Sequence, residues 1–138
     1  MWLITGGMYQ NKLEYAMEIS GIAIDEVADG ATCELKEIYT KKIVDNFNLL
    51  IKRLLKDEAD VYELVENIVK LNPDIIIITD ELGCGIVPID AFDRRYRETS
   101  GRIACEIAKK SSQVHRVVCG IGTVIKDAKG IFNQTFNN

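Results

Sequence analysis

The hydrophobic and polar positions of the chain predict strands that alternate with helices. Residues 75–78 are four consecutive isoleucines, placed between the helix-ending pair Asn72-Pro73 and a polar, glycine-rich turn. A continuous β-branched run predicts a strand that is buried on both faces, and such a strand normally lies in the middle of a parallel sheet. Shorter apolar runs over residues 2–5 and 114–120 predict two further strands.

Apolar residues recur at three- and four-residue intervals in several places, which predicts amphipathic helices. These helices are expected from Lys12 onward, over residues 35–55, over residues 61–71, and from the N-cap Asp90 to about residue 110. Residues 21–33 show no clear period, so the number of strands there stays open. Strands interleaved with helices indicate one α/β domain with a mostly parallel sheet, and a loosely ordered polar tail is expected over residues 127–138.

The composition is that of an ordinary globular protein, with 47% hydrophobic and 28% charged residues. A formal charge of −4 and a pI near 5.1 argue against a protein that binds nucleic acid through its phosphates. No apolar run approaches the roughly 18 residues needed to cross a membrane, and the first residues lack the charged segment of a signal peptide. A cytoplasmic protein without membrane contact is therefore expected.

The cysteines and the histidine give little sign of chemistry. No Cys-x-x-Cys spacing is present, which argues against a zinc or redox site and favours small buried hydrophobes. The histidine, His115, is expected to be a polar position on a strand rather than a ligand or a catalytic base. The cysteines concerned are Cys33, Cys84, Cys105 and Cys119.

The first predicted strand, turn and helix have the layout of a phosphate loop. The fingerprint G-x-x-x-x-G-K-[ST] finds its first glycine at Gly6 and its lysine at Lys12, while Asn11 and Leu13 replace the second glycine and the hydroxyl. Asparagine tolerates left-handed backbone angles better than most residues, but leucine cannot coordinate the magnesium that bridges the phosphates. The pattern alone fits an ordinary strand-to-helix turn equally well.

The end of the isoleucine strand is the second candidate site. Asp80 and Glu81 follow the strand, and Gly83 and Gly85 hinge the loop behind them. The carboxyl edge of a parallel sheet is where such folds bind ligands. The predicted helix after this loop carries a cluster of arginines that would suit an anionic partner, although a solvated helix face explains them as well. The arginines are Arg94, Arg95, Arg97 and Arg102.

Three segments together resemble the bifunctional adenosylcobinamide kinase and adenosylcobinamide-phosphate guanylyltransferase family of cobalamin biosynthesis. The family reads roughly V-T-G-G-x-x-S-G-K-S, V-T-N-E-V-G-x-G-I-V-P and R-x-F-R-D-x-x-G-R at these places. The resemblance covers residues 1–12 and 73–126 and is faint between them. The matching segments are Ile4-Thr5-Gly6-Gly7 with Lys12, Ile78-Thr79-Asp80-Glu81-Leu82-Gly83-Cys84-Gly85-Ile86-Val87-Pro88, and Arg94-Arg95-Tyr96-Arg97-Glu98-Thr99-Ser100-Gly101-Arg102.

The resemblance implies a RecA-like phosphate-loop domain that transfers phosphate from ATP or GTP, with Mg²⁺, to the adenosylcobinamide hydroxyl. Gly6, Gly7, Asn11 and Lys12 would hold the nucleotide, and Lys12 would neutralise phosphate charge. Asp80 would help to hold the metal, and Asp80 or Glu81 would orient the attacking hydroxyl. The glycines of the loop and the arginines would bind phosphate or substrate, and a homo-oligomer is expected. These last residues are Gly83, Gly85, Arg94, Arg97 and Arg102.

The chain also departs from the family. The histidine that carries GMP in the family lies before the isoleucine strand, whereas this chain has no histidine before His115. A phosphoramidate to GMP needs an imidazole nitrogen, so the guanylyltransferase half is expected to be absent. Three hypotheses follow: a shortened kinase, a non-catalytic nucleotide- or corrinoid-binding relative that acts as a sensor or partner subunit, and a structural protein in which Gly6 and Gly7 only turn the chain.

Overall fold

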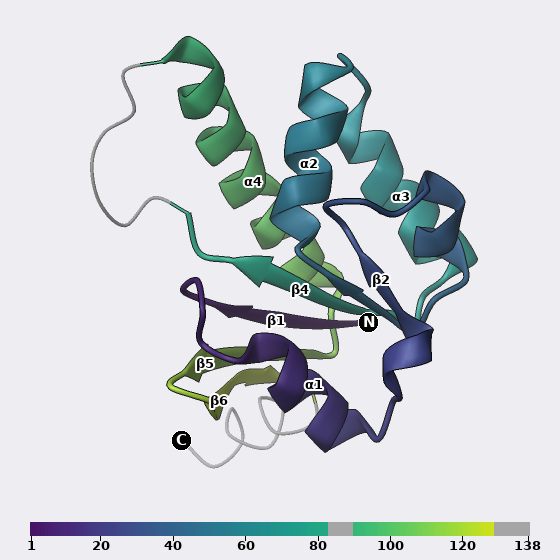
Figure 1. Ribbon diagram of the computed structural model, residues 1–138, viewed down its shortest axis with the longest axis vertical. Coiled ribbons are helices and arrows are strands. Elements are labelled where there is room, and N and C mark those ends of the chain that lie inside the picture. The colour runs from purple at the N-terminus through teal and green to yellow at the C-terminus, as the bar shows by residue number, and fades with distance from the viewer. Residues whose placement is uncertain (83–89, 129–138) are drawn as a thin grey trace.

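A computed structural model describes residues 1–82 and 90–128 of the chain. Strands and helices alternate along it, as the sequence predicts (Figure 1). The strands are β1 (Trp2–Gly6), β2 (Val27–Asp29), β3 (Ile43–Asp45), β4 (Ile76–Asp80), β5 (Gln113–Val118) and β6 (Ile121–Asp127). The helices are α1 (Lys12–Ser20), α2 (Phe47–Lys56), α3 (Val61–Leu71) and α4 (Ala91–Lys110), with short 3₁₀ helices η1 (Ile24–Glu26) and η2 (Leu35–Tyr39).

The strands form a single six-stranded sheet in the order β2-β3-β4-β1-β5-β6. All neighbouring pairs are parallel except β5 and β6, which are antiparallel. The isoleucine strand β4 lies between β3 and β1, and its buried run is completed by Ile75 just before it. The prediction of a doubly buried strand inside a parallel sheet is confirmed.

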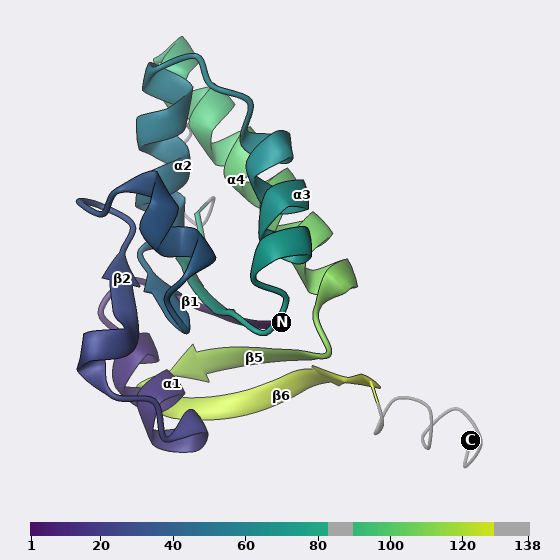
Figure 2. The same ribbon diagram turned by 90° about the vertical axis from the view of Figure 1, so that its right-hand side faces the viewer.

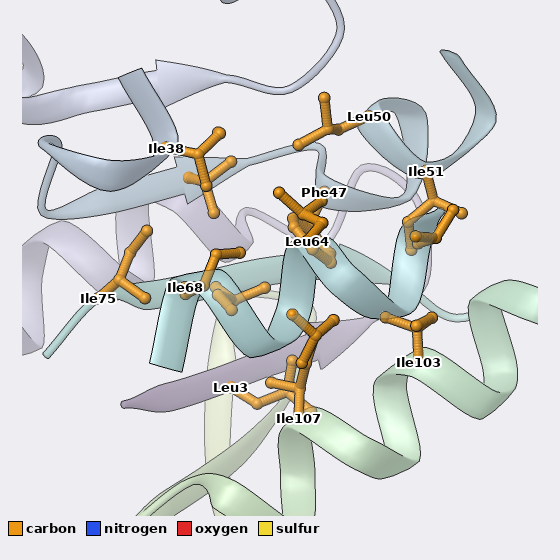
Figure 3. Close-up of a cluster of buried hydrophobic side chains, with 14 of the residues drawn as sticks. Leu3, Ile38, Phe47, Leu50, Ile51, Leu64, Ile68, Ile75, Ile103 and Ile107 are labelled. Atoms are coloured by element: carbon orange, nitrogen blue, oxygen red, sulfur yellow. The ribbon is translucent and has the colours of Figure 1, made fainter. Parts of the chain in front are cut away.

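Helices cover both faces of the sheet (Figures 1 and 2). Helices α2, α3 and α4 pack on one face, where Leu3 and Ile77 of the sheet meet Phe47, Ile68 and Ile107 of the helices (Figure 3). Helix α1 packs on the other face over a smaller cluster that includes Ile4, Ile78 and Val117. This is the mostly parallel α/β arrangement of a RecA-like phosphate-loop domain, and the predicted fold class is confirmed. Within the described ranges, no helix combines the length and apolarity that a membrane span requires.

The prediction of one long helix over residues 35–55 is wrong. The structure divides this stretch into η2, β3 and α2. Ile43 and Val44 are fully buried in the sheet, because strand β3 extends it beyond β4. A strand of three residues is too short to show a two-residue period, and its apolar residues fall by chance at helical intervals from those on either side.

The end of the chain and the cysteines also differ from the expectation. Asp127, expected at the start of the loose tail, belongs to β6, while residues 129–138 of that predicted tail lie outside the described residues. A tight hairpin turn at Cys119 and Gly120, both with positive φ, joins β5 to β6. Cys33 is buried as expected, whereas Cys105 and Cys119 are exposed, and Cys84 lies outside the described residues.

Candidate functional site

Lys12 and Asp80, which the sequence placed at one site, are in direct contact. Strands β1 and β4 are parallel neighbours whose last residues, Gly6 and Asp80, are paired in register. Helix α1 begins at Lys12, and its ammonium lies 2.7 Å from Oδ1 of Asp80 while donating to the carbonyl of Gly7 at 2.6 Å. Only 7% of the Lys12 side chain is exposed. A buried cation therefore lies at the carboxyl edge of the sheet, where the phosphate-loop hypothesis requires it.

The backbone of the loop has the form that the fingerprint predicts. Asn11 adopts left-handed angles, φ 62° and ψ 38°, at the position where the fingerprint has its second glycine. Gly6 packs so closely on β5 that a Cβ atom would collide with the carbonyl of Val117. Gln10 joins the loop to the β5–β6 turn, because its side-chain oxygen accepts from the backbone N–H of Cys119 at 2.6 Å. Gly7 has no such steric requirement and contributes its carbonyl to Lys12.

A cavity of about 280 Å³ opens beside this contact. Its wall consists of residues 8–14 of the loop and helix α1, together with Asp45, Asn46 and Asp80. Asn11 and Leu13 are in this wall, and open space of about 280 Å³ remains beside them. The two altered residues of the fingerprint therefore do not fill the place where a phosphate would bind.

Asp45 is a site residue that the sequence reasoning missed. It ends β3, and its carboxyl faces the same cavity as Asp80. Burial raises the pKa of Asp45 above its usual range, and the nearby carboxylates of Asp29 and Asp80 act in the same direction. The backbone N–H of Asn46 and the ammonium of Lys12 oppose that rise. The position of Asp45 after a strand was the available signal, but it was hidden because the segment had been assigned to a helix.

Asp45 and Asp80 suit a magnesium ion that is shared with phosphates. Mg²⁺ is usually bound through one or two protein carboxylates, with phosphate oxygens and water completing its coordination. Across residues 1–82 and 90–128, no group of three or more His, Cys, Asp or Glu side chains is placed to hold a metal by itself. Asp45 and Asp80 are therefore residues that could hold a metal ion whose other ligands come from phosphate and water.

Asn48 is a second residue that the sequence did not reveal. Its side chain is 2% exposed, its Oδ1 accepts from the backbone N–H of Asp80 at 3.1 Å, and its Nδ2 donates to the hydroxyl of Tyr96 at 3.2 Å. One amide thus fixes the end of β4 relative to helices α2 and α4. A buried polar side chain that holds the backbone of a site residue is a positioning group.

Glu81 does not share the contact between Lys12 and Asp80. Its backbone N–H donates to the carbonyl of Gly6 at 2.8 Å, and its carboxylate accepts two hydrogen bonds from the guanidinium of Arg116 at 2.8 and 3.1 Å. This bidentate pair lies outside the wall of the loop cavity. Gly83 and Gly85, the other predicted residues of this segment, lie outside the described residues.

The predicted arginines lie along α4 and do not line the loop cavity. Arg102 forms an ion pair with Glu98 one turn away, and both side chains are well exposed. Arg97 and Arg102 line a broad hollow of about 610 Å³ next to Tyr62 of α3. The solvated helix face, which was the alternative interpretation of the cluster, describes Arg102 best.

His115 lies on β5 beneath α1, as the expected polar position of a strand. Its Nδ1 is 2.7 Å from the hydroxyl of Tyr15 and its Nε2 is 2.8 Å from Oε1 of Gln113. Burial lowers the pKa of His115, and the charge of Asp127 on β6 opposes this only in part. The contacts fit a neutral ring with the proton on Nε2, which leaves neither nitrogen available for another partner.

The fold and the site together define a phosphate-loop protein of the RecA-like α/β class. A glycine turn leads from the first strand into a helix, and the lysine of that helix contacts the aspartate of the adjacent parallel strand. The family model described as cobinamide kinase / cobinamide phosphate guanyltransferase matches residues 30–125, well over half of the chain, so the chain belongs to this family. The match includes residues 30–72, where the resemblance read from the sequence was faint, and it begins after the phosphate loop.

Two curated relatives agree with this assignment. The Bifunctional adenosylcobalamin biosynthesis protein CobU of Escherichia coli (strain K12) is 32% identical over 68 residues, which cover 49% of this chain and 38% of that protein. The protein of the same name from Salmonella typhimurium (strain LT2) is 32% identical over 76 residues, 55% of this chain and 41% of that protein. The chain therefore spans about two-fifths of the length of these relatives.

Proposed function

We propose that this chain is a nucleotide-dependent kinase that phosphorylates the hydroxyl of a cobinamide-type alcohol and lacks the guanylyl transfer of its family. The observation that carries this proposal is the contact of Lys12 with Asp80 beside an open cavity at the carboxyl edge of the sheet. Membership of the cobinamide kinase family supports the substrate class.

The loop and Lys12 are suited to hold a polyphosphate. An ammonium has three N–H donors, and two of those on Lys12 are used by Asp80 and Gly7, which leaves one for a phosphate oxygen. The first turn of α1 directs its free backbone N–H groups and the positive end of its dipole toward the same space. Phosphoryl transfer depends mainly on positioning and charge stabilisation, which these groups supply.

Asp80 and Asp45 are the residues that would hold a magnesium ion. When bound, Mg²⁺ neutralises charge on the β- and γ-phosphates of the nucleotide. Leu13 offers no hydroxyl to it, whereas Asp45 and Asp80 place two carboxylates from the ends of strands β3 and β4 in the cavity wall, which also contains Glu14. The carboxylate of Asp45 would thus replace the hydroxyl ligand that the fingerprint has at the position of Leu13.

The proposed reaction is a direct transfer. The acceptor hydroxyl oxygen bonds to the γ-phosphorus while the bond from that phosphorus to the β-bridging oxygen breaks, and the nucleoside diphosphate leaves with the electron pair. The hydroxyl proton passes to an oxygen of the transferred phosphoryl group. We assign Asp80 to orient the attacking hydroxyl, because it lines the loop cavity whereas Glu81 is held by Arg116.

The structure of His115 supports the loss of guanylyl transfer. A phosphoramidate intermediate requires a ring nitrogen that can reach a nucleotide. His115 is the single histidine of the chain, it is 5% exposed, and both of its nitrogens are occupied by Tyr15 and Gln113. It also lies beneath α1 and does not line the loop cavity.

A second candidate is a binding module that keeps nucleotide or corrinoid binding without turnover. The specific observation in its favour is Leu13, because a kinase of this class uses a hydroxyl there to coordinate magnesium. We further propose that the protein works in the cytoplasm as a homo-oligomer, which the exposed apolar residues of its edge strand β6 support.

Exchange of Lys12 tests the proposed function. Calorimetric titration of ATP and GTP, with and without Mg²⁺, is compared for wild type, Lys12→Met and the exposed control Lys36→Met, and turnover is measured with cobinamide. We expect at least tenfold weaker nucleotide binding for Lys12→Met and no change for Lys36→Met. Because Lys12→Met leaves the Asp80 carboxylate without its cation, the double variant Lys12→Met/Asp80→Asn serves as a second test in case the single variant does not fold.

Three results separate the possibilities. Nucleotide binding with cobinamide-dependent release of ADP or GDP supports the kinase. Binding that depends on Lys12 without any release supports the binding module. Equal nucleotide affinity in wild type and Lys12→Met would refute both.

A further inference from the structure

A second, smaller cavity lies across the end of β4 from the phosphate loop. It measures about 190 Å³ and is enclosed by the ends of β1 and β4 on one side and helix α4 on the other. Thr5 and Thr79 of the strands and Ser100 of the helix supply hydroxyl groups to its wall, and Leu82 and Ala104 supply apolar surface. Helix α4 covers the face of the sheet opposite α1 (Figures 1 and 2). The small cavity is lined by α4, whereas the phosphate loop leads into α1.

The hydroxyl of Ser100 has no hydrogen-bond partner among the described residues. The side chain is 6% exposed and its Oγ is buried, yet no group of residues 1–82 or 90–128 accepts from it or donates to it. A buried hydroxyl without a partner destabilises the fold. Since Ser100 lines the cavity, a polar atom of a ligand bound there would supply the missing partner.

The backbone of α4 is also open toward a ligand at this place. Gly101 follows Ser100 in the middle of a 20-residue helix, where glycine is less favourable than alanine. No described atom lies within 4 Å of where its Cβ would be, so packing within the described residues does not require a glycine. Gly101 lines the same cavity as Ser100.

Asp80 connects the small cavity to the phosphate loop. It is in the wall of both cavities, because it ends the strand that separates them. Its carboxylate is balanced by Lys12, and the carboxylate of Glu81, which also lines the small cavity, is balanced by Arg116. The small cavity therefore has hydroxyl groups, apolar surface and paired charges, which suit a neutral ligand that carries hydrogen-bonding groups.

We propose that this small cavity is the acceptor subsite of the kinase, where Ser100 hydrogen-bonds the neutral arm that carries the reacting hydroxyl and directs it past Asp80 toward the γ-phosphate. The inference rests on the proposed function and deepens it. A cavity of about 190 Å³ is large enough for a short aliphatic alcohol or amide arm. The bulk of a large acceptor stays outside.

The test compares two serines of the same helix region. Ser100→Ala removes the unpaired hydroxyl, whereas the control Ser111→Ala removes an equally buried hydroxyl that donates to the carbonyl of Ile107 at 2.7 Å and lies away from the cavity. Cobinamide is titrated into each full-length protein and followed by its visible absorption, and ATP with Mg²⁺ is titrated separately by calorimetry. We expect about fivefold weaker cobinamide binding for Ser100→Ala, unchanged ATP binding, and wild-type affinities for Ser111→Ala.

A third variant and thermal melts test the subsite without relying only on the hydrogen bond of Ser100. Ala104→Leu fills the cavity and is expected to abolish cobinamide binding while ATP binding persists. Ser100→Ala should melt no lower than wild type because its hydroxyl is unpaired, whereas Ser111→Ala should melt lower. If Ser100→Ala weakens cobinamide binding without lowering the melting temperature, Ser100 recognises the ligand and is not needed for the fold.

The outcomes distinguish this inference from the function on which it rests. If wild type binds ATP and cobinamide, and Ser100→Ala and Ala104→Leu bind cobinamide as wild type does, the subsite is refuted and the proposed function stands. If wild type binds ATP but not cobinamide, or binds neither ligand, the proposed function itself fails and the subsite fails with it.

Discussion

The pKa of the Asp45 carboxyl is raised, mainly because the group is buried and also because the carboxylates of Asp29 and Asp80 are nearby. An acid whose pKa is raised by folding binds its proton more tightly in the folded state, so stability is lost as pH rises from the unfolded pKa through the folded one. At neutral pH the charge of Asp45 therefore destabilises the fold. A residue that lowers stability at a cavity wall is expected where a function depends on it.

The isosteric change Asp45→Asn should therefore stabilise the free protein by about 1 kcal/mol at pH 7. The gain should shrink as pH falls and disappear below the unfolded pKa of about 3.9, where Asp45 is protonated in both states. Urea unfolding at several pH values measures it, with the exposed Asp74→Asn as the control. The same variant should weaken Mg²⁺-dependent nucleotide binding. A loss of stability at pH 7 would contradict the stated role of burial.

Some site residues were predictable and others were not. Lys12, Asp80 and the tolerance of position 11 for a left-handed residue follow from local pattern, because a phosphate loop is a continuous segment of chain. Asn48 and Ser100 owe their importance to what lies next to them in space. Nothing in the sequence distinguishes these two from other polar residues on a helix.

At the scale of elements, Tyr15, His115 and Gln113 join helix α1 to strand β5. Burial lowers the pKa of His115, so the unfolded chain binds this proton more readily than the folded one. The contribution of His115 to the free energy of unfolding is fully present above the unfolded pKa of about 6.5, and it is lost as the pH falls below that value.

We therefore expect the free energy of unfolding to decline between pH 6.5 and 5, and His115→Gln to reduce that slope. Tyr15→Phe should lower stability by about 1 kcal/mol at pH 7, since it leaves Nδ1 of His115 without its donor. Denaturant titrations across this pH range test both effects. A slope that is identical in wild type and His115→Gln would show that other groups control the acid response.

Two glycines with equally open surroundings allow a backbone test of α4. Gly101 is inside the helix, whereas Gly21 ends α1 with φ 74°, and nothing described lies within 4 Å of either Cβ position. Gly101→Ala should raise stability by about 1 kcal/mol because alanine favours the helix, and Gly21→Ala should lower it by a similar amount because of its left-handed angles. Thermal melts compare the two. A lower melting temperature for Gly101→Ala would mean that the glycine is needed for packing.

The elements themselves were predictable in proportion to their length and regularity. The central strand β4 and helices α1, α3 and α4 each carry an apolar run or a helical period with clear ends, such as Asp90, which accepts from the N–H of Phe92 at 2.7 Å. Strands β2 and β3 have only three residues each, and their identity depends on pairing with distant strands. Strand β6 was not predicted, because most of its residues are exposed and its sequence therefore lacks the alternation of buried apolar and exposed polar residues.

For the molecule as a whole, strand β6 forms an edge of the sheet with exposed apolar side chains. No described strand pairs with its outer side, and apolar side chains at the hairpin are exposed by 51% or more. An unpaired edge with apolar side chains normally becomes covered by another chain. The exposed residues are Val118, Ile121, Val124 and Ile125.

If a second copy covers this edge, light scattering after size exclusion should give a mass of more than one chain for the wild type. Ile121→Lys should then shift the protein to the monomer mass, since a charge at a side chain that is 73% exposed harms association but not folding. Ile24→Lys is the matched control, because Ile24 is 63% exposed but lies in η1, which leads into β2 at the opposite edge of the sheet. A wild type that is monomeric at all concentrations, or an Ile121→Lys oligomer, would place any interface elsewhere. Because the hairpin also binds Gln10 of the phosphate loop, association at this edge would bring a second chain next to the nucleotide site.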